Sequence, residues 1–522
     1  MRWSLMETFN QLHLIDLHGN IKKREKAPDG SPDANVFPIG QGVSINVFMK
    51  PPIDRDIDDK SVVRHADLWG QKETKLGWLG QVAGSDTDWT ELQPESPFHL
   101  FVPYDQSEAG EYWSWPAVNE IFPVNVTGIV TARDAFVIDF DREVLLYRIV
   151  DFRSNERSDQ EIREKYFAGK GSRMYATGNS QGWKVPDARR KVRKDKNWDE
   201  RYAPILYRSF DIRVIYYAPW MVDWPRTEAM PDMLAGENLG LIFMRQAAQG
   251  DSYTHFGVSR VPVDHRAFYS NNGIISFSPL YLYPDIGKSD GTLLQTWPKG
   301  QGGRRPNLEP AFVKAISEGS GLTFGSDGRV DLDNGFGPDD ALAYIYSVFH
   351  SPEYRRRFEP MLKLDFPRVP LPGAAESFGD LAKVGHELLA LHLLESPTLD
   401  STISRYEGPP EPEVEKVSYS ADTVWLDKAQ TRGFEGVPEE VWNFQVRGYQ
   451  VCEKWLKDRQ AKGGKNPRPG RILTDEDIAH YQKIIVAISE TIRIMGDIDE
   501  VIDQHGGWPD AFQTTKSKGS EA

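Results

Sequence analysis

The chain is poor in cysteine and has neither a long apolar run nor a phosphate-binding loop, and each absence excludes a class of protein. Its single cysteine, Cys452, excludes an internal disulfide and a cysteine-based zinc cluster. No apolar run approaches the roughly 18 residues that a membrane-spanning helix needs, and Met1-Arg2-Trp3 begins no secretory signal. No Walker A lysine loop is present, so P-loop ATP chemistry is not expected. We therefore expect a cytoplasmic protein without a membrane segment.

Positive charge is also in short supply. The chain has 62 lysines and arginines against 77 acidic residues, a formal net charge of -15. Such a charge repels nucleic acid at long range, because neutralisation of phosphates supplies most non-specific affinity. Basic residues are dense only locally: residues 189–196 contain six in eight positions. Contact with nucleic acid at this stretch is one interpretation, and a solvated loop is the other.

The first 50 residues predict a short helix followed by two strands of an α/β sheet. Residues 12–17 form an apolar run that ends at His18-Gly19-Asn20. A second strand is expected in residues 36–49, where polarity alternates from residue 41 onward.

Stronger strand patterns occupy the middle of the chain. With 39% hydrophobic and 11% aromatic residues, the 522-residue chain can form roughly two to four domains. Short strand-like runs at residues 98–103 and 127–132 precede five stronger ones, which we expect in one sheet with recognition loops on one edge. The five runs are residues 205–207, 212–217, 239–244, 274–277 and 280–283.

Helical spacing dominates the last third. Apolar residues recur at steps of three and four in residues 339–349, 351–362 and 378–394. The proline-rich residues 407–413 mark the clearest boundary, and a hairpin is expected at residues 414–426. A last helix is predicted over residues 475–504 with Thr474 as its N-cap, followed by a loose polar tail.

Ten sequence blocks along nearly the whole chain resemble the C-terminal part of type ISP restriction-modification enzymes. Those enzymes join a nuclease, a helicase, an adenine-N6 DNA methyltransferase and a target-recognition domain in one chain. Two blocks depart from the family pattern: Ser209 stands where proline is usual, and Arg447 stands where glycine is usual, which changes the charge of a tight turn. The blocks are LIDLHGNIKK (14–23), VNVTGIVTARD (124–134), PILYRSFDIRVIYY (204–217), MLAGENLGLI (233–242), PLYLYPD (279–285), RRPNLEPAF (304–312), YIYSVFHSPEYR (344–355), LDFPRVPLP (364–372), LHLLESP (391–397) and VWNFQVRGYQVCEKWLKDR (441–459).

The resemblance implies an α/β fold in which a remnant of a methyltransferase Rossmann-like sheet precedes a mixed α/β target-recognition domain and a mostly helical C-terminal region. The implied domains are the last strands of an adenine-N6 methyltransferase at residues 1–50, a target-recognition (specificity) domain at 51–406, a hairpin and helices at 407–505, and a flexible tail at 506–522.

The implied function is sequence-specific recognition of double-stranded DNA, which positions an adenine for methylation by a catalytic half absent from this chain. A glycine-rich cofactor loop is missing, because the glycine clusters at residues 300–303 and 319–321 lack the strand before and the helix after that such a loop requires. An Asn-Pro-Pro-Tyr/Phe turn is missing as well. No cofactor is therefore expected here. S-adenosylmethionine is expected on an upstream methyltransferase/helicase-nuclease half, which is the expected protein partner. A divergent complete adenine-specific DNA methyltransferase and a non-catalytic structural subunit of a phage-defence complex remain as alternatives.

Arginine is the side chain best suited to read DNA, because its planar fork holds guanine O6 and N7 together or clamps a phosphate. For each candidate a structural ion pair is the competing explanation, with Asp134, Asp211 and Glu309 as nearby partners. The candidate DNA-binding residues are Arg133, Arg189, Arg190, Lys191, Arg208, Arg213, Arg245, Gln246, Arg304 and Arg305.

Two other constellations are weaker. His13, Asp16 and His18 crowd one strand in a pattern that a metal site can use, but a packing role is favoured. Acidic pairs such as Asp331 and Asp333 have no spacing that singles out a glycosidase. We predict no catalytic and no metal-binding residue.

Overall fold

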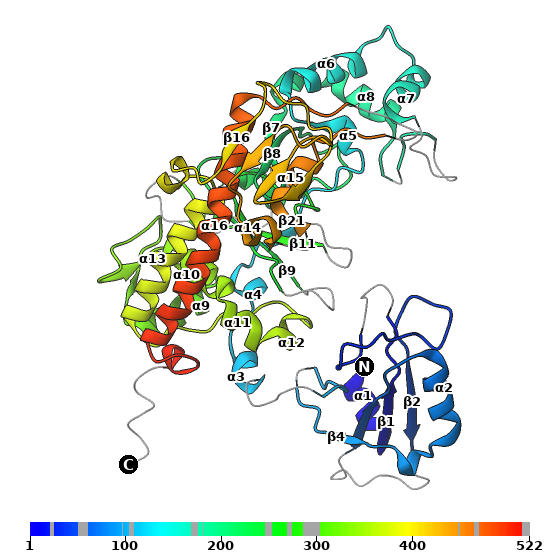
Figure 1. The fold of residues 1–522 in the computed structure, drawn as a ribbon. Helices are drawn as coiled ribbons and strands as arrows, with labels where there is room; N and C mark the ends of the chain where they lie inside the picture. The colour runs from blue at the N-terminus through cyan, green and yellow to red at the C-terminus, as the bar shows by residue number, and fades with distance from the viewer. Residues whose placement is uncertain are drawn as a thin grey trace. The chain divides into compact units, whose positions relative to one another are not determined.

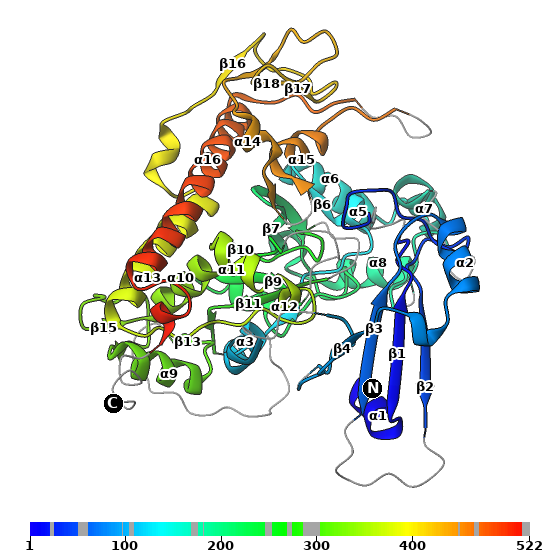
Figure 2. The same ribbon diagram turned by 60° about the horizontal axis from the view of Figure 1, so that its bottom comes forward.

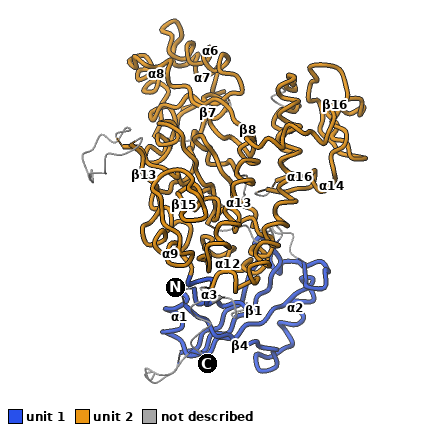
Figure 3. Tube along the Cα trace, turned by 90° about the vertical axis from the view of Figure 1, so that its left-hand side faces the viewer, with its two compact units in different colours: residues 1–114, 249–251 blue, residues 115–248, 252–522 orange. Residues whose placement is uncertain are grey.

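The computed structural model divides the chain into two compact units (Figure 3). The first contains residues 1–114 with 249–251, and the second contains residues 115–248 with 252–522. This division falls inside the segment 51–406 that the sequence suggests as one domain. The structure describes residues 1–20, 26–50, 61–96, 98–103, 109–168, 176–180, 182–245, 253–268, 274–284, 303–446, 449–463 and 469–513.

The first unit is built around a four-stranded sheet with the order β2-β1-β3-β4 (Figure 2). β1 pairs antiparallel with β2 and parallel with β3, so this sheet is mixed. The sequence predicted two strands in residues 1–50; β3 and β4 extend the sheet on the far side of β1. The elements are α1 (Arg2–Thr8), β1 (Gln11–Asp16), β2 (Ser44–Met49), β3 (Val62–Asp67), α2 (Lys72–Gln81), β4 (Thr90–Leu92) and α3 (Ala109–Ser114).

A buried ion pair fixes α2 in this unit. The Lys75 ammonium lies 2.7 Å from Asp33 Oδ1, and both side chains are fully buried. The same ammonium donates to the carbonyl oxygens of Leu17 at 2.7 Å and Ala34 at 2.8 Å. A buried charge is tolerated only when it is paired and hydrogen-bonded in this way. The predicted strand at residues 98–103 does not form; residues 101 and 102 lie in bends.

The five strand-like runs that were expected in one sheet belong to three separate sheets of the second unit. β7 and β8 form a hairpin, and β6 pairs with the other edge of β8, which gives the order β6-β8-β7. β9 and β11 belong to a second sheet with the order β10-β9-β11-β5. β12 pairs instead with β13. These strands are β5 (Val126–Thr127), β6 (Ile138–Asp139), β7 (Tyr202–Arg208), β8 (Asp211–Tyr216), β9 (Gly240–Met244), β10 (Gly257–Ser259), β11 (Ile275–Pro279), β12 (Tyr281–Leu282) and β13 (Arg305–Pro306).

Helices α6 to α8 gather beside the first of these sheets and share a hydrophobic core with it (Figure 1). The basic residues 189–194 belong to α8, so most of this stretch is helical, unlike the solvated loop considered from the sequence. α8 is amphipathic: Val185, Ala188 and Val192 are buried, while Lys191 and Lys194 face solvent. The helices are α4 (Val118–Ile121), α5 (Asp134–Val137), α6 (Arg142–Arg153), α7 (Asp159–Phe167) and α8 (Val185–Lys194).

The C-terminal part is mostly helical, as predicted. α13 packs against both α10 and α16, and Figures 1 and 2 show the three side by side. α16 spans the predicted residues 475–504, and Thr474 caps it by accepting from the amide of Asp477. These helices are α9 (Pro310–Ser320), α10 (Pro338–His350), α11 (Pro352–Arg357), α12 (Glu359–Leu362), α13 (Ala375–His392), α14 (Glu439–Asn443), α15 (Val451–Lys457) and α16 (Asp475–Gln504).

A small sheet and a short C-terminal segment complete this part. The sheet has the order β16-β19-β18-β17, and its β17–β18 hairpin lies in the predicted residues 414–426. Ala511 and Phe512, within the segment predicted as a tail, are buried, and Phe512 packs on Trp508. The strands are β14 (Thr323–Phe324), β15 (Gly335–Phe336), β16 (Arg405–Glu407), β17 (Ser418–Ser420), β18 (Thr423–Trp425), β19 (Gly433–Glu435), β20 (Gln445–Val446) and β21 (Tyr449–Gln450).

Candidate nucleic-acid interface

A polar cleft of about 800 Å³ opens in the second unit beside the β6-β8-β7 sheet. Its walls come from the α5–β6 segment, from the β7–β8 hairpin and from the turn that follows Val263. Two predicted DNA-binding residues, Arg133 and Arg213, contribute to it. The lining residues are Val130, Ala132, Arg133, Asp134, Ala135, Ile138, Asp139, Phe140, Tyr207, Arg213, His265 and Arg266.

Arg213 is fixed between two aromatic rings in this cleft. Its guanidinium carbon lies 4.0 Å from the centre of the Phe140 ring and 3.9 Å from that of Tyr207. It donates two hydrogen bonds to Asp211 Oδ2, at 3.0 and 2.7 Å. Burial alone would raise the pKa of Asp211, but the guanidinium groups of Arg213 and Arg459 hold that pKa below its ordinary value. Arg213 is therefore a wall of the cleft with a fixed orientation.

Arg133 is almost completely buried beneath the cleft. It donates to the carbonyl oxygens of Thr131 at 2.7 Å and Met221 at 3.0 Å, and it pairs with Asp223. Its guanidinium also stacks on Trp183 at 3.8 Å. Burial lowers the pKa of Arg133, and the hydrogen bond to Asp223 opposes that shift. For Arg133 these contacts fit the structural ion pair that the sequence suggests as the alternative to a contact with DNA.

Two further candidates are also committed to internal contacts. Arg208 pairs with the fully buried Asp264 at 3.3 Å and stacks on the ring of its neighbour Tyr207 at 4.1 Å. Arg189 points inward from α8 and donates to the carbonyl oxygens of Phe152, Ser154 and Arg157 at 2.7 to 2.8 Å. Both side chains hold segments together that are distant in sequence.

Arg266 is an arginine of the cleft that the sequence did not single out. Its side chain is exposed, and among the residues that the structure describes no carboxylate lies within ion-pair distance of its guanidinium. The turn that carries it is fixed, because the Arg266 amide donates to Asp264 Oδ1 at 2.9 Å. One arginine in a connecting loop has no periodicity or neighbouring basic residue to draw attention to it.

The outer face of α8 supplies a second group of cations. Arg190 is 62% exposed and pairs with Asp187, one turn earlier in the same helix. Lys191 is exposed beside it. Further exposed lysines of this region are Lys184, Lys194 and Lys196. Arg190 and Lys191 thus differ from Arg189, although the three are adjacent in the sequence.

The remaining candidates lie outside the lining of the cleft. Arg245 is exposed at the end of β9 and pairs with Asp365 at 2.9 Å. Arg304 pairs with Asp327 at 2.8 Å and stacks on Tyr281 at 3.9 Å. Arg305 is half-buried in β13. Gln246 lies outside the described residues.

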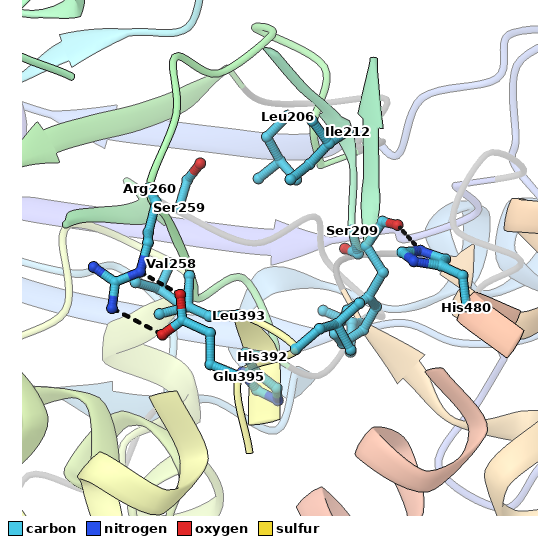
Figure 4. Close-up of a pocket in the computed structure, with 13 residues that line it drawn as sticks. Leu206, Ser209, Ile212, Val258, Ser259, Arg260, His392, Leu393, Glu395 and His480 are labelled. Atoms are coloured by element: carbon cyan, nitrogen blue, oxygen red, sulfur yellow. Dashed lines mark hydrogen bonds and ion pairs between the residues drawn. The ribbon is translucent and has the colours of Figure 1, made fainter. Parts of the chain in front are cut away.

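A second, smaller cavity of about 190 Å³ lies near the β7–β8 turn and the end of α13 (Figure 4). Its lining is mainly apolar and includes Leu206, Ile212 and Leu393. The polar groups around it are engaged in internal contacts: Arg260 pairs with Glu395, His480 donates to the Phe210 carbonyl at 2.8 Å, and Ser209 and His392 bond to hydroxyl side chains. None of the predicted DNA-binding residues lines this cavity.

Neither a metal site nor a membrane segment emerges from the described residues. His18 hydrogen-bonds Asp67 at 2.8 Å and stacks on Trp69, which accounts for its conformation without a metal. Within the described ranges, no group of three or more His, Cys, Asp or Glu residues is arranged to hold a metal ion. None of the helices that the structure describes combines the length and apolarity needed to cross a bilayer.

The fold is similar to three solved structures. A nuclease-deletion mutant of the Type ISP restriction-modification enzyme LlaGI, in complex with a DNA substrate mimic, aligns with a TM-score of 0.59 at 18% identity. The ATP-dependent Type ISP enzyme LlaBIII bound to DNA gives 0.64 at 18%, and the DrdV-DNA complex gives 0.64 at 19%. Each alignment covers 95% of this chain but only 37%, 32% and 48% of the respective relative. This chain therefore spans less than half the length of each.

Sequence comparison identifies the family. A search of curated proteins finds no match. The family described as the Type ISP C-terminal specificity domain matches residues 120–497, which is most of the chain and includes the whole lining of the polar cleft. Because the match extends over more than half of its residues, the chain belongs to the Type ISP C-terminal specificity domain family.

Proposed function

We propose that this chain recognises a specific DNA sequence for a restriction-modification system of the Type ISP kind and so positions an adenine for N6 methylation. The polar cleft carries this proposal. It lies within the family-matched residues and combines an exposed arginine, Arg266, with carboxylates, groups that can form hydrogen bonds with base edges in duplex DNA. The three structural relatives were solved with DNA or a DNA mimic, which is consistent with this assignment.

The charge distribution is compatible with DNA despite the net charge of -15. Buried pairs such as Arg208 with Asp264 remove equal numbers of positive and negative charges from the surface and leave the net charge unchanged. Exposed cations meanwhile remain on α8, where Arg190 and Lys191 face solvent. In this proposal α8 contacts phosphates and the cleft contacts bases, because sequence-independent and sequence-dependent contacts need different surroundings.

The methyl transfer itself is assigned to a separate catalytic half that binds S-adenosylmethionine. Support comes from the edge of the first sheet. Among the described strands β2 pairs only with β1, so its outer edge is open, and Ile45, Val47 and Met49 on one face are each at least 38% exposed. An open edge with an apolar face is a template for further strands. We propose that strands of the catalytic half continue the sheet here.

Selection from a random pool tests the recognition function directly. The 522-residue chain is mixed with duplexes of random sequence, and the retained duplexes are sequenced. Enrichment of one motif is expected; retention without enrichment, or no retention, would overturn the proposal. Calorimetric binding of S-adenosylmethionine by the chain alone would instead favour a complete methyltransferase. Co-purification with a methyltransferase, without affinity for DNA, would favour a structural subunit.

A further inference from the structure

We propose that Arg266 is a specificity-determining residue that contacts the edge of a guanine in duplex DNA. This inference rests on the proposed function and assigns the kind of contact made in the cleft. It depends on three features: the freedom of the Arg266 guanidinium, the carboxylates beside it and the covered faces of the neighbouring aromatic rings.

Arg266 differs from the other arginines around the cleft. Arg133, Arg208 and Arg213 each have a carboxylate partner and a stacked ring, so their guanidinium groups are held by internal contacts. Arg266 is exposed with no such partner in the described part of the chain. A free guanidinium can offer two parallel N–H donors, which match the O6 and N7 acceptors of guanine in the major groove.

The backbone that presents Arg266 is rigid. Its amide is held by Asp264, and the amide of His265 donates to the Ile129 carbonyl at 3.0 Å. Gly128 allows this close approach: a Cβ at that position would lie 2.5 Å from the Cα of His265. A side chain that reads a nucleobase binds best from a fixed backbone, because only the side chain itself then has to be ordered on binding.

Carboxylates in the same cleft disfavour a phosphate as the partner of Arg266. Asp134 and Asp139 both line the cleft. Asp139 forms an ion pair with Arg148 at 2.5 Å. Among the described side chains, Asp134 accepts hydrogen bonds only from hydroxyl groups, namely those of Thr131 and of Tyr207, the latter at 3.4 Å. An ionised Asp134 repels phosphate, but it accepts hydrogen bonds from the exocyclic amino groups of cytosine or adenine. The cleft therefore suits base edges.

Tyr207 and Phe140 in the cleft are unsuited to hold a flipped base. The Tyr207 ring is covered by Arg208 and Arg213, at 4.1 and 3.9 Å. The Phe140 ring is covered by Arg213 at 4.0 Å and by Arg459 at 4.7 Å. An extruded base needs an open ring face to stack on. We infer that the bases read in this cleft remain paired in the duplex.

The test compares Arg266→Ala and Arg266→Lys with the unaltered chain. Sequences selected from the random duplex pool identify a preferred motif for each protein, and affinities for that motif and for an unrelated duplex are measured over a range of salt concentrations. Arg356→Ala, which removes an exposed arginine paired with Glu353 on α11, is the matched control. Circular dichroism confirms that each variant is folded.

We expect Arg266→Ala to lose preference for guanine at one position only, with roughly 5- to 150-fold weaker binding to the motif. Affinity for the unrelated duplex stays unchanged, and Arg266→Lys loses most of the preference because lysine lacks the fork. An equal loss on both duplexes, with a shallower salt dependence, identifies a phosphate contact and overturns the inference while leaving the proposed function intact. An unchanged motif overturns it as well. Failure of the unaltered chain to select any motif refutes the proposed function itself.

Discussion

The Asp211 carboxylate accepts a hydrogen bond of 3.0 Å from the guanidinium of Arg459, 248 positions later in the sequence. Both side chains are buried, and the other oxygen of Asp211 binds Arg213 at 2.7 Å. Arg459 follows α15 and also stacks on Trp455 at 3.4 Å. This pair therefore fastens the first residue of β8, beside the polar cleft, to the C-terminal core.

Removal of this carboxylate should destabilise the second unit strongly. Asp211→Ala leaves the buried Arg459 without its ion-pair partner and removes the nearer of the two carboxylates that pair with Arg213, and such a loss costs about 3–5 kcal/mol. Urea unfolding followed by tryptophan fluorescence measures the change in the free energy of unfolding. Arg356→Ala, which breaks an exposed pair, should cost at most about 1 kcal/mol. Equal effects of the two substitutions would show that the buried pair does not tie the parts together.

Stability should fall in mild acid because of His480. Burial lowers the pKa of His480 below its ordinary 6.5, although the hydrogen bond to Phe210 opposes the shift. The folded chain then binds this proton more weakly than the unfolded chain does. The stability that the neutral His480 contributes is complete above about pH 6.5 and is lost as the pH falls below that value. The free energy of unfolding then decreases by at most about 1.4 kcal/mol per pH unit.

The His480→Gln variant separates this titration from others. Glutamine keeps a donor for the Phe210 carbonyl but cannot bind a proton in this range. Free energies of unfolding are measured at several values between about pH 7.5 and 5.5, a range that brackets the ordinary pKa of histidine. A smaller decrease in the variant than in the unaltered chain is expected. If the free energies of unfolding of the two proteins changed with pH in parallel, His480 would take up its proton as easily in the folded chain as in the unfolded chain.

The sequence was most informative where local pattern and local chemistry agree. The residues of α16 could be predicted from a regular apolar stripe and from Thr474, because both signals lie in the helix or directly before it. The run at residues 98–103 looks like a strand by composition, yet a strand also needs a neighbour to pair with, and this requirement is not visible locally. Division of the expected sheet into three likewise depends on pairing between distant segments.

The candidate site was less predictable because the environment of an arginine depends on tertiary contacts. Arg189 and Arg190 are adjacent and identical in type, but the helix turns the first inward onto three carbonyl oxygens and the second outward. Arg133 is buried by Trp183 and Asp223, which lie 50 and 90 residues away. Arg266 was missed because its exposure and freedom are properties of the folded turn.

Substitutions in α8 should separate DNA binding from stability. Arg190→Ala combined with Lys191→Ala should weaken binding to any duplex, with little change in stability. The salt slope should fall by about 0.9 for each phosphate that these side chains neutralise. Arg189→Ala should instead destabilise the chain by about 1–3 kcal/mol, because it leaves the carbonyl oxygens of Phe152, Ser154 and Arg157 without their donor. Salt titrations of affinity and urea unfolding measure the two effects. An unchanged salt slope in the double variant would remove α8 from the interface.

The open edge of β2 should make the isolated chain self-associate. Val47 is 50% exposed in the middle of this strand, between Ile45 and Met49 on the same face. A lysine on an edge strand discourages pairing with another chain, because its charge must stay in water. Val47→Lys should therefore lower the association constant measured by sedimentation velocity. Val144→Lys, which changes a valine 46% exposed on α6, should leave association unaltered. If both variants associated as strongly as the unaltered chain, the edge of β2 would not be a contact surface. The structural support for a sheet shared with a catalytic half would then be lost.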